Sequence, residues 1–219
     1  MIANVKSLNN KGNILEIPEK YVTEGTIGDL GVVCGNEASS SAIYIAKSTP
    51  CAYLQSNKRP IWGMIMFNNA FLKYDQEGFQ QILFVGIHEM THILGFSAAL
   101  FPTYPGGNPL VEDEDGFNYL SSPLIQEEIK NFYGCPNALG MPLEDQDGTL
   151  VASHWEKKII GNEFMIASNK KGSFVSRFTL ALLNSTGWYP EVDYSYAEPS
   201  TWGLNKGCKF LNVDDCSSE

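Results

Sequence analysis

Short apolar runs separated by turn residues occupy the first third of the chain, a pattern that predicts β-strands. Three runs carry the prediction, at residues 14–17, 42–46 and 61–67. The first ends at Pro18, the second is flanked by serine-rich turns, and the third ends at Asn68. The segments between them are rich in Gly, Asn and Ser, so loops are expected there.

Residues 77–94 have the spacing of an α-helix. Phe79, Leu83 and Ile87 recur every four residues, and further apolar side chains extend this surface. A helix that is apolar around most of its circumference is expected to lie buried beneath other elements. Gly95 follows it, and glycine can take the left-handed conformation that ends a helix.

The second half of the chain predicts helices joined by long loops. Residues 102–116 contain Pro, Gly, Asn and the acidic cluster 112–115, a composition typical of a loop. Amphipathic helices are expected over 123–133 and over 173–186. The residues from 188 onward have no regular pattern and are expected to be irregular.

The change of pattern at Gly95 predicts an α+β fold with two parts. The first, residues 1–95, is a strand-rich N-terminal subdomain that ends with a buried helix. The second, residues 96–219, is a C-terminal subdomain of helices and loops. A chain of 219 residues can bury a sizeable core in such an arrangement.

Charge and composition narrow the class of protein. The chain has 15 Lys and Arg against 25 Asp and Glu, a net charge of −10 at pH 7. Such a surface repels nucleic-acid phosphates and anionic lipid headgroups. No apolar stretch approaches the roughly 18 residues of a membrane-spanning helix, and residues 1–20 lack the pattern of a signal peptide. We therefore expect a cytosolic protein, unless the chain begins downstream of its true start.

The motif that carries chemistry is H-E-x-x-H, at residues 88–92 of the predicted helix. Its spacing places His88 and His92 on one helical face a turn apart, so both can reach one metal ion. Glu89 is then placed to contact a water molecule at the metal. Two imidazoles and a carboxylate inside an apolar helix would be costly without a shared partner, which favours a metal site over a buried structural pair.

A catalytic zinc normally has three protein ligands and one open position, so a third ligand is needed. His154 is the one remaining histidine, 62 residues after the second, and imidazole suits zinc well. The alternatives are Glu112 and Glu114 of the acidic cluster. Such a run of charges is usually a solvated loop and not a metal site. The five cysteines show no C-x-x-C spacing, which argues against a cysteine-based zinc site.

Four segments together resemble the leishmanolysin family of metzincin metalloproteases. They are His-Glu-Met-Thr-His-Ile-Leu-Gly-Phe at 88–96, Ser-His-Trp-Glu-Lys at 153–157, Glu-Phe-Met at 163–165 and Trp-Gly-Leu-Asn-Lys-Gly-Cys-Lys-Phe-Leu at 202–211. They occur in the family's order, and the long gap before His154 matches an insertion that these proteases carry. The resemblance is clearest from Ile61 to the end of the chain.

The resemblance implies a metzincin-like fold in which Met165 forms an apolar floor beneath the zinc. It also implies a disulfide between Cys135 and Cys208, with weaker support for one between Cys34 and Cys51, and leaves Cys216 without a partner. The family suggests an extracellular or cell-surface protein, whereas from this sequence we expect no signal peptide, propeptide, C-terminal domain or lipid anchor.

The implied function is a zinc-dependent endopeptidase that acts on proteins or peptides as a monomer. In this hypothesis Glu89 is the general base that deprotonates the attacking water. The strand at 61–67 is expected to bind extended substrate by edge pairing. The alternative is a catalytically inactive zinc-binding module, for instance one used in cell adhesion, although such a module has no need of Glu89.

Overall fold

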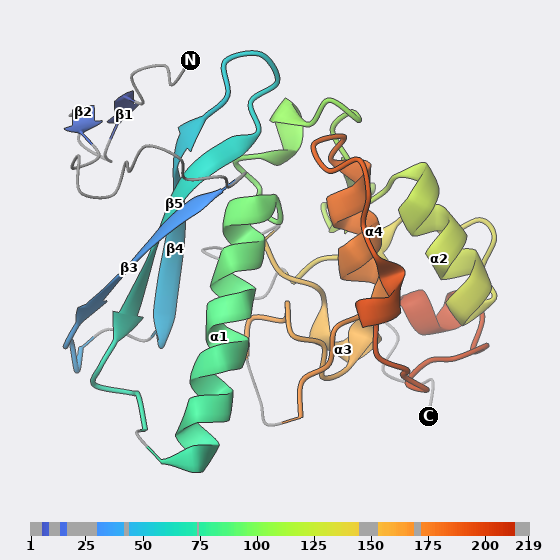
Figure 1. Ribbon diagram of the computed structural model, residues 1–219. Helices are drawn as coiled ribbons and strands as arrows, with labels where there is room; N and C mark the ends of the chain where they lie inside the picture. The colour runs from blue at the N-terminus through green and yellow to red at the C-terminus, as the bar shows by residue number, and fades with distance from the viewer. Residues whose placement is uncertain are drawn as a thin grey trace.

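A mixed α+β arrangement is seen in the computed structural model (Figure 1). A sheet and the long helix α1 lie on one side of the molecule, and shorter helices gather on the other. The described residues are 6–8, 14–16, 30–41, 44–73, 75–144, 153–168 and 172–212.

The larger sheet of the first half has three strands. They are β3 (Gly31–Glu37), β4 (Ala46–Tyr53) and β5 (Pro60–Asn68), in the order β3-β5-β4. β3 runs parallel to β5, and β4 runs antiparallel to it. Two shorter strands, β1 (Lys6–Leu8) and β2 (Ile14–Glu16), form a separate antiparallel pair.

The prediction that strand 61–67 binds substrate by edge pairing is wrong. This segment is β5, which lies between β3 and β4 and is hydrogen-bonded on both sides. A central strand has no free backbone groups to offer a peptide, whereas an edge strand has. In this sheet the edges belong to β3 and β4.

The expected strands are partly confirmed. β2 and β5 match the predictions at 14–17 and 61–67, whereas the strand expected over 42–46 begins only at Ala46. Residues 42 and 43 lie outside the described part of the chain. β4 extends instead through Pro50, which a strand can contain at the edge of a sheet because the missing N–H breaks no interior ladder.

The predicted central helix is confirmed as α1 (Gln76–Leu94). It begins at Asp75, whose carboxylate accepts a hydrogen bond from the backbone N–H of Gly78 at 2.7 Å. It ends at Gly95, but the expected left-handed conformation is wrong, because the φ of Gly95 is 164°, outside the left-handed region. Close packing better explains why residue 95 is a glycine, because a Cβ there would lie 3.2 Å from both Thr186 and Tyr104.

The expectation that α1 is buried around its circumference is also wrong. Val85 and Ile93 face the interior, and β5 approaches so closely that a Cβ on Gly63 would lie 2.6 Å from the Ile93 side chain. The sheet covers only one side of the helix (Figure 1). Four large apolar side chains of α1 are therefore 38–66% exposed, namely Phe79, Leu83, Ile87 and Met90.

The second half contains three helices and a small sheet among the described residues. α2 (Pro123–Tyr133) has the predicted bounds, and α3 (Lys157–Ile160) was not anticipated. α4 (Arg177–Ser185) is shorter than the predicted 173–186, because the Ser176 hydroxyl caps it by accepting from the Thr179 N–H.

Short elements fill the connections of this half. β6 (Leu110–Glu112), β7 (Asn118–Leu120) and β8 (Met141–Pro142) form an antiparallel sheet. Single 3₁₀ turns lie at η2 (Phe101–Thr103), η3 (Tyr194–Tyr196) and η4 (Cys208–Leu211). The acidic cluster lies largely in the loop from β6 to β7, as its composition predicted.

The main hydrophobic core is built from residues between Phe96 and Leu211. Phe96, Ile129, Tyr133 and Trp155 are fully buried in it. The core therefore lies mainly to one side of α1, and the division into subdomains 1–95 and 96–219 stays a prediction. None of the helices in the described ranges has the length and hydrophobicity needed to cross a bilayer.

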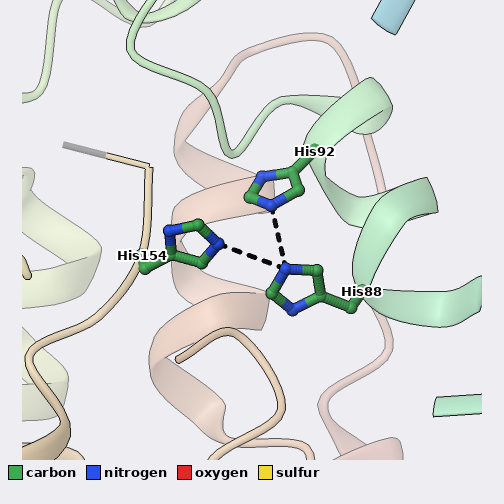
Figure 2. A group of neighbouring side chains, drawn as sticks. All are labelled: His88, His92 and His154. Carbon is green, nitrogen blue, oxygen red and sulfur yellow. Dashed lines mark hydrogen bonds between the residues drawn. The ribbon is translucent and has the colours of Figure 1, made fainter. Parts of the chain in front are cut away.

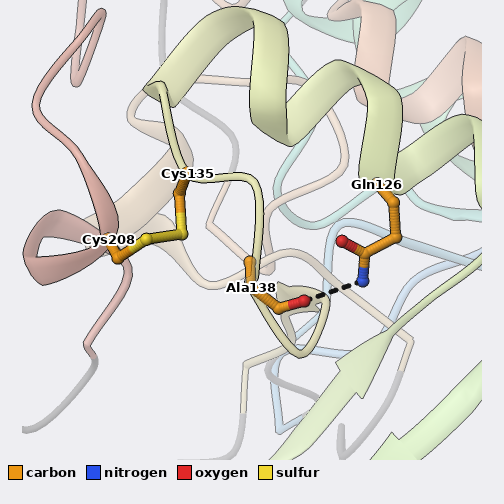
Figure 3. Close-up of a disulfide and its surroundings, with 4 residues drawn as sticks. All are labelled: Gln126, Cys135, Ala138 and Cys208. Carbon is orange, nitrogen blue, oxygen red and sulfur yellow. Dashed lines mark hydrogen bonds between the residues drawn. A yellow bond between two sulfur atoms is a disulfide. The ribbon is translucent and has the colours of Figure 1, made fainter.

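A disulfide joins Cys135, just beyond α2, to Cys208 in η4 (Figure 3). It confirms the pairing that the family resemblance implied and connects segments 73 residues apart. The pairing of Cys34 with Cys51 is wrong, because both are free thiols. They lie on β3 and β4 with β5 between them, and two strand spacings of about 4.8 Å exceed the reach of a disulfide. Cys216 lies outside the described residues.

Candidate metal centre

Two imidazoles from α1 form the first part of the site. His88 and His92 lie one turn apart on the helix, as the spacing predicted, and their Nε2 atoms are 3.0 Å apart. His88 is buried and His92 partly buried. The two rings meet edge to face at an angle of 89°. The short distance between their Nε2 atoms shows that these nitrogens converge.

The third imidazole comes from the segment that precedes α3. The His154 Nε2 lies 3.2 Å from the Nε2 of His88 (Figure 2). Backbone hydrogen bonds hold this segment: the Glu144 N–H donates to the His154 carbonyl, and the Trp155 N–H donates to the Met165 carbonyl. The three histidines form a group whose ligand atoms all lie within 4.8 Å of one another.

Backbone carbonyls orient two of the rings. His88 donates from Nδ1 to the Phe164 carbonyl at 2.7 Å, and His92 donates from Nδ1 to the Phe96 carbonyl at 2.6 Å. An imidazole that uses Nδ1–H in this way presents a lone pair at Nε2, the usual arrangement of metal-ligating histidine. The Nε2 atoms are the ones that face each other.

Burial favours the neutral form of the His88 and His92 imidazoles by lowering the pKa of each. It lowers the pKa of His88, and the hydrogen bond to Phe164 only partly opposes this effect. Burial, with the proximity of His88, lowers the pKa of His92 to about 3. Neutral imidazoles place several lone pairs together at about 3 Å, an arrangement that repels unless a cation lies between them.

The donor set fits a tetrahedral metal ion. Nitrogens bound at 2.0–2.1 Å in a tetrahedron are about 3.3 Å apart, close to the two separations observed between Nε2 atoms. Glu112 and Glu114, the alternative third ligands, are both exposed and lie outside this group. The geometry therefore favours His154 as the third ligand.

Glu89 lies next to His88 on α1 and is 6% exposed. Burial raises the pKa of its carboxyl, and contact with the Ser48 hydroxyl of β4 opposes this effect. A carboxyl with a raised pKa is a better proton acceptor than a solvated one at neutral pH. The contact also places β4 against the functional face of α1.

Comparison with known proteins gives the family directly. The family model described as leishmanolysin matches residues 4–219, almost the whole chain. The chain belongs to the leishmanolysin family. The resemblance seen in four sequence segments is thereby confirmed.

Relatives from several organisms share the sequence at low identity. The chain is 31% identical over 183 residues to the ciliated left-right organizer metallopeptidase of Mus musculus, which covers 76% of this chain. It is 28% identical over 207 residues to the leishmanolysin-like peptidase of Drosophila melanogaster, covering 76% of the chain. A leishmanolysin homolog of Crithidia fasciculata is 28% identical over 207 residues and covers 90%. The chain spans 26% of the mouse relative's length and 30% of the other two.

Met165 of this leishmanolysin-family chain is fully buried. Its backbone carbonyl accepts from the Trp155 N–H, and its neighbour Phe164 accepts from His88. Met165 is thus bonded to the backbone next to His154, and its neighbour Phe164 to the His88 imidazole. The role of Met165 as a floor stays a prediction.

The end of α1 is fixed by tyrosines that the sequence did not single out. The Tyr189 hydroxyl donates to the Leu94 carbonyl at 2.7 Å, and the Tyr104 hydroxyl donates to the Gly95 carbonyl at 2.8 Å. Carbonyls at a helix end have no partner within the helix, so these bonds satisfy them and hold the turn that carries His92.

Proposed function

We propose that the protein is a zinc-dependent endopeptidase with His88, His92 and His154 as zinc ligands. The observation that carries this proposal is the convergence of three Nε2 atoms within 4.8 Å of one another. Family membership supports it, since the matching model is that of leishmanolysin and the relatives are named as peptidases.

With zinc held by these three histidines, the site would contain a Lewis acid that lowers the pKa of a bound water to about 7. The chain supplies the rest of the chemistry. Glu89 accepts a proton from the attacking water as general base and returns it to the departing amine nitrogen. The Phe164 and Phe96 carbonyls hold His88 and His92 in the tautomer that leaves Nε2 without hydrogen.

The substrate in this proposal is an extended peptide segment of a protein. β4 is the strand suited to bind it, because β4 is an edge strand and its Ser48 contacts Glu89. A peptide pairing along this edge would lie beside the carboxylate that acts on it. Such pairing recognises backbone, so it sets the direction of the peptide more than its sequence.

The finer structure in this proposal is that of a metzincin. Residues 1–95 would form the subdomain that carries the sheet and α1, and residues 96–219 the subdomain that carries His154. Met165 would lie beneath the zinc as an apolar floor, where a soft thioether packs well.

Metal analysis and a cleavage assay test the proposal together. Purified protein is expected to contain one zinc per chain and to cleave casein or an unstructured peptide. A chelator should abolish cleavage, and added zinc should restore it. Cleavage that persists after complete zinc removal would refute a metallopeptidase. Bound zinc without any cleavage would instead favour the inactive adhesion module.

A further inference from the structure

Glu163 is a fully buried carboxylate that the proposed reaction does not use. Both of its oxygens accept hydrogen bonds. Oε1 accepts from the Ser176 N–H at 3.3 Å, the Ser176 hydroxyl at 2.8 Å and the Thr179 hydroxyl at 2.6 Å. Oε2 accepts from the Met165 N–H. One side chain thus joins the start of α4 to the segment around Met165.

The first connection from Glu163 leads to His88 through a single peptide group. The Met165 N–H that donates to Glu163 and the Phe164 carbonyl that accepts from His88 belong to the same planar unit. Fixing the direction of the N–H fixes the direction of the carbonyl on its opposite side. When the Glu163 carboxyl is ionised, it also polarises the peptide and makes the Phe164 carbonyl a stronger acceptor.

The second connection leads towards His154. The indole N–H of Trp155 can only donate, and it donates to the Thr179 hydroxyl at 2.8 Å. Thr179 must then give its own hydrogen onward, which it does to Glu163. The series therefore runs in one direction, from the residue beside His154 to the carboxylate.

Resting on the proposed zinc site, we propose that Glu163 is a positioning residue for the metal centre. It orients His88 through the peptide between Phe164 and Met165, and it holds the backbone of His154 through Thr179 and Trp155. The hydrogen bonds of Glu163 go to Ser176, Thr179 and Met165, so its effect on the two imidazoles passes through these groups. Loss of a group that hydrogen-bonds a metal ligand commonly weakens metal binding 10–100-fold, and Glu163 holds such a group, the Phe164 carbonyl.

The donor pattern requires both carboxylate oxygens. Four donors converge on the group, and each needs an acceptor. Burial raises the pKa of Glu163 to about 7, and the hydrogen bonds from Thr179, Met165 and Ser176 limit this rise. An amide side chain of the same size offers only one acceptor oxygen.

The decisive variant is Glu163→Gln. If its oxygen keeps the donors at Ser176 and Thr179, its NH₂ group faces the Met165 N–H, donor against donor, and the peptide that orients His88 is released. We expect the zinc dissociation constant to rise about 10–100-fold, measured by competition with a chromophoric chelator. The visible absorption spectrum of the cobalt-substituted protein should also change, because it reports ligand orientation.

Glu128→Gln is the matched control. Glu128 is also buried, and it forms a two-point ion pair with Arg177 away from the three imidazoles. This variant loses a buried carboxylate of another element, and its zinc affinity and cobalt spectrum should equal those of the wild type. Equal weakening in both variants would overturn the inference, because it would indicate general destabilisation.

Thr179→Val keeps the inference testable if Glu163→Gln does not fold. It preserves the shape at a fully buried position and removes the hydroxyl that links Trp155 to Glu163. A smaller rise in the zinc dissociation constant, about 2–10-fold, is expected with a changed cobalt spectrum. Wild-type affinity and spectrum in a folded Glu163→Gln or Thr179→Val protein would overturn the inference. Wild-type protein that binds no zinc would overturn the proposed function itself.

Discussion

The two nitrogens of the His88 imidazole have separate tasks. Nδ1 donates to the Phe164 carbonyl, and Nε2 faces the corresponding atoms of His92 and His154. This division determines the tautomer and leaves the lone pair where a metal ion can accept it. The same pattern at His92 uses the Phe96 carbonyl.

Glu89→Gln separates metal binding from proton transfer. The amide keeps the size of the side chain but cannot act as a base, so peptide hydrolysis should fall about 10²–10⁴-fold. The zinc content should stay at the wild-type value, because Glu89 is not one of the three ligands. Turnover rate and metal content are measured on the same preparation. A variant that hydrolyses peptide at the wild-type rate would remove Glu89 from the mechanism.

His154→Ala tests the ligand that is distant in sequence. Loss of one of three protein ligands should lower the zinc content sharply and abolish hydrolysis. Glu114→Ala is the control, since this exposed carboxylate was one of the two alternative ligands, with Glu112, and its loss should leave the zinc content unchanged. The opposite result, with zinc lost only in Glu114→Ala, would assign the third ligand to the acidic cluster.

At the scale of elements, α1 has two faces with different energetic roles. Ile93 is fully buried and touches the backbone of β5, whereas Leu83 is 52% exposed. Ile93→Ala should lower the free energy of unfolding by about 2–5 kcal/mol, through lost burial and a new cavity. Leu83→Ala should change it by less than about 1 kcal/mol. Urea denaturation of the two variants measures the difference, and equal losses would show that the outer face is covered.

Elements with strong periodicity were predictable from the sequence. α1 and α2 combine regular apolar spacing with capping residues, Asp75 and Ser122, and both were found at the expected positions. β4 was displaced in the prediction because its polar residues and Pro50 resemble a loop. Its register depends on pairing with β5, which local sequence does not encode.

The three histidines of the metal group could be predicted from the sequence, but the groups that orient them could not. H-E-x-x-H carries a spacing rule, and His154 followed from the need for a third ligand. The carbonyls of Phe96 and Phe164 are backbone atoms without a side-chain signal, and the contact of Ser48 with Glu89 depends on the tertiary fold. The resemblance included Glu163 in a segment, yet its hydrogen-bond partners appear only in three dimensions.

At the scale of the whole molecule, Glu163 links stability to pH. Its pKa is raised from 4.5 to about 7, so between these values the folded state holds the proton more tightly than the unfolded state. The free energy of unfolding contributed by this group is therefore highest below pH 4.5 and falls as the pH rises to 7. The change is about 3 kcal/mol, at 1.4 kcal/mol per pKa unit.

Chemical denaturation of chelator-treated protein at several pH values measures this effect. Chelation removes the separate contribution of metal release at low pH. The free energy of unfolding of the wild type, minus that of Glu163→Gln, should vary over this pH range, because the amide does not titrate. A difference that is constant between pH 4.5 and 7 would show that Glu163 titrates normally.

The outward face of α1 affects how the folded protein must be studied. Phe79, Leu83, Ile87 and Met90 form an apolar ridge of about 16 Å, since a helix rises 1.5 Å per residue. Dyes such as ANS bind exposed apolar surface and are widely used as signs of a loosened, molten state. Here the native molecule should itself bind such a dye, so a bright signal would not indicate unfolding. Near-ultraviolet circular dichroism, which follows the packing of buried aromatic rings, is the better measure of nativeness for this chain.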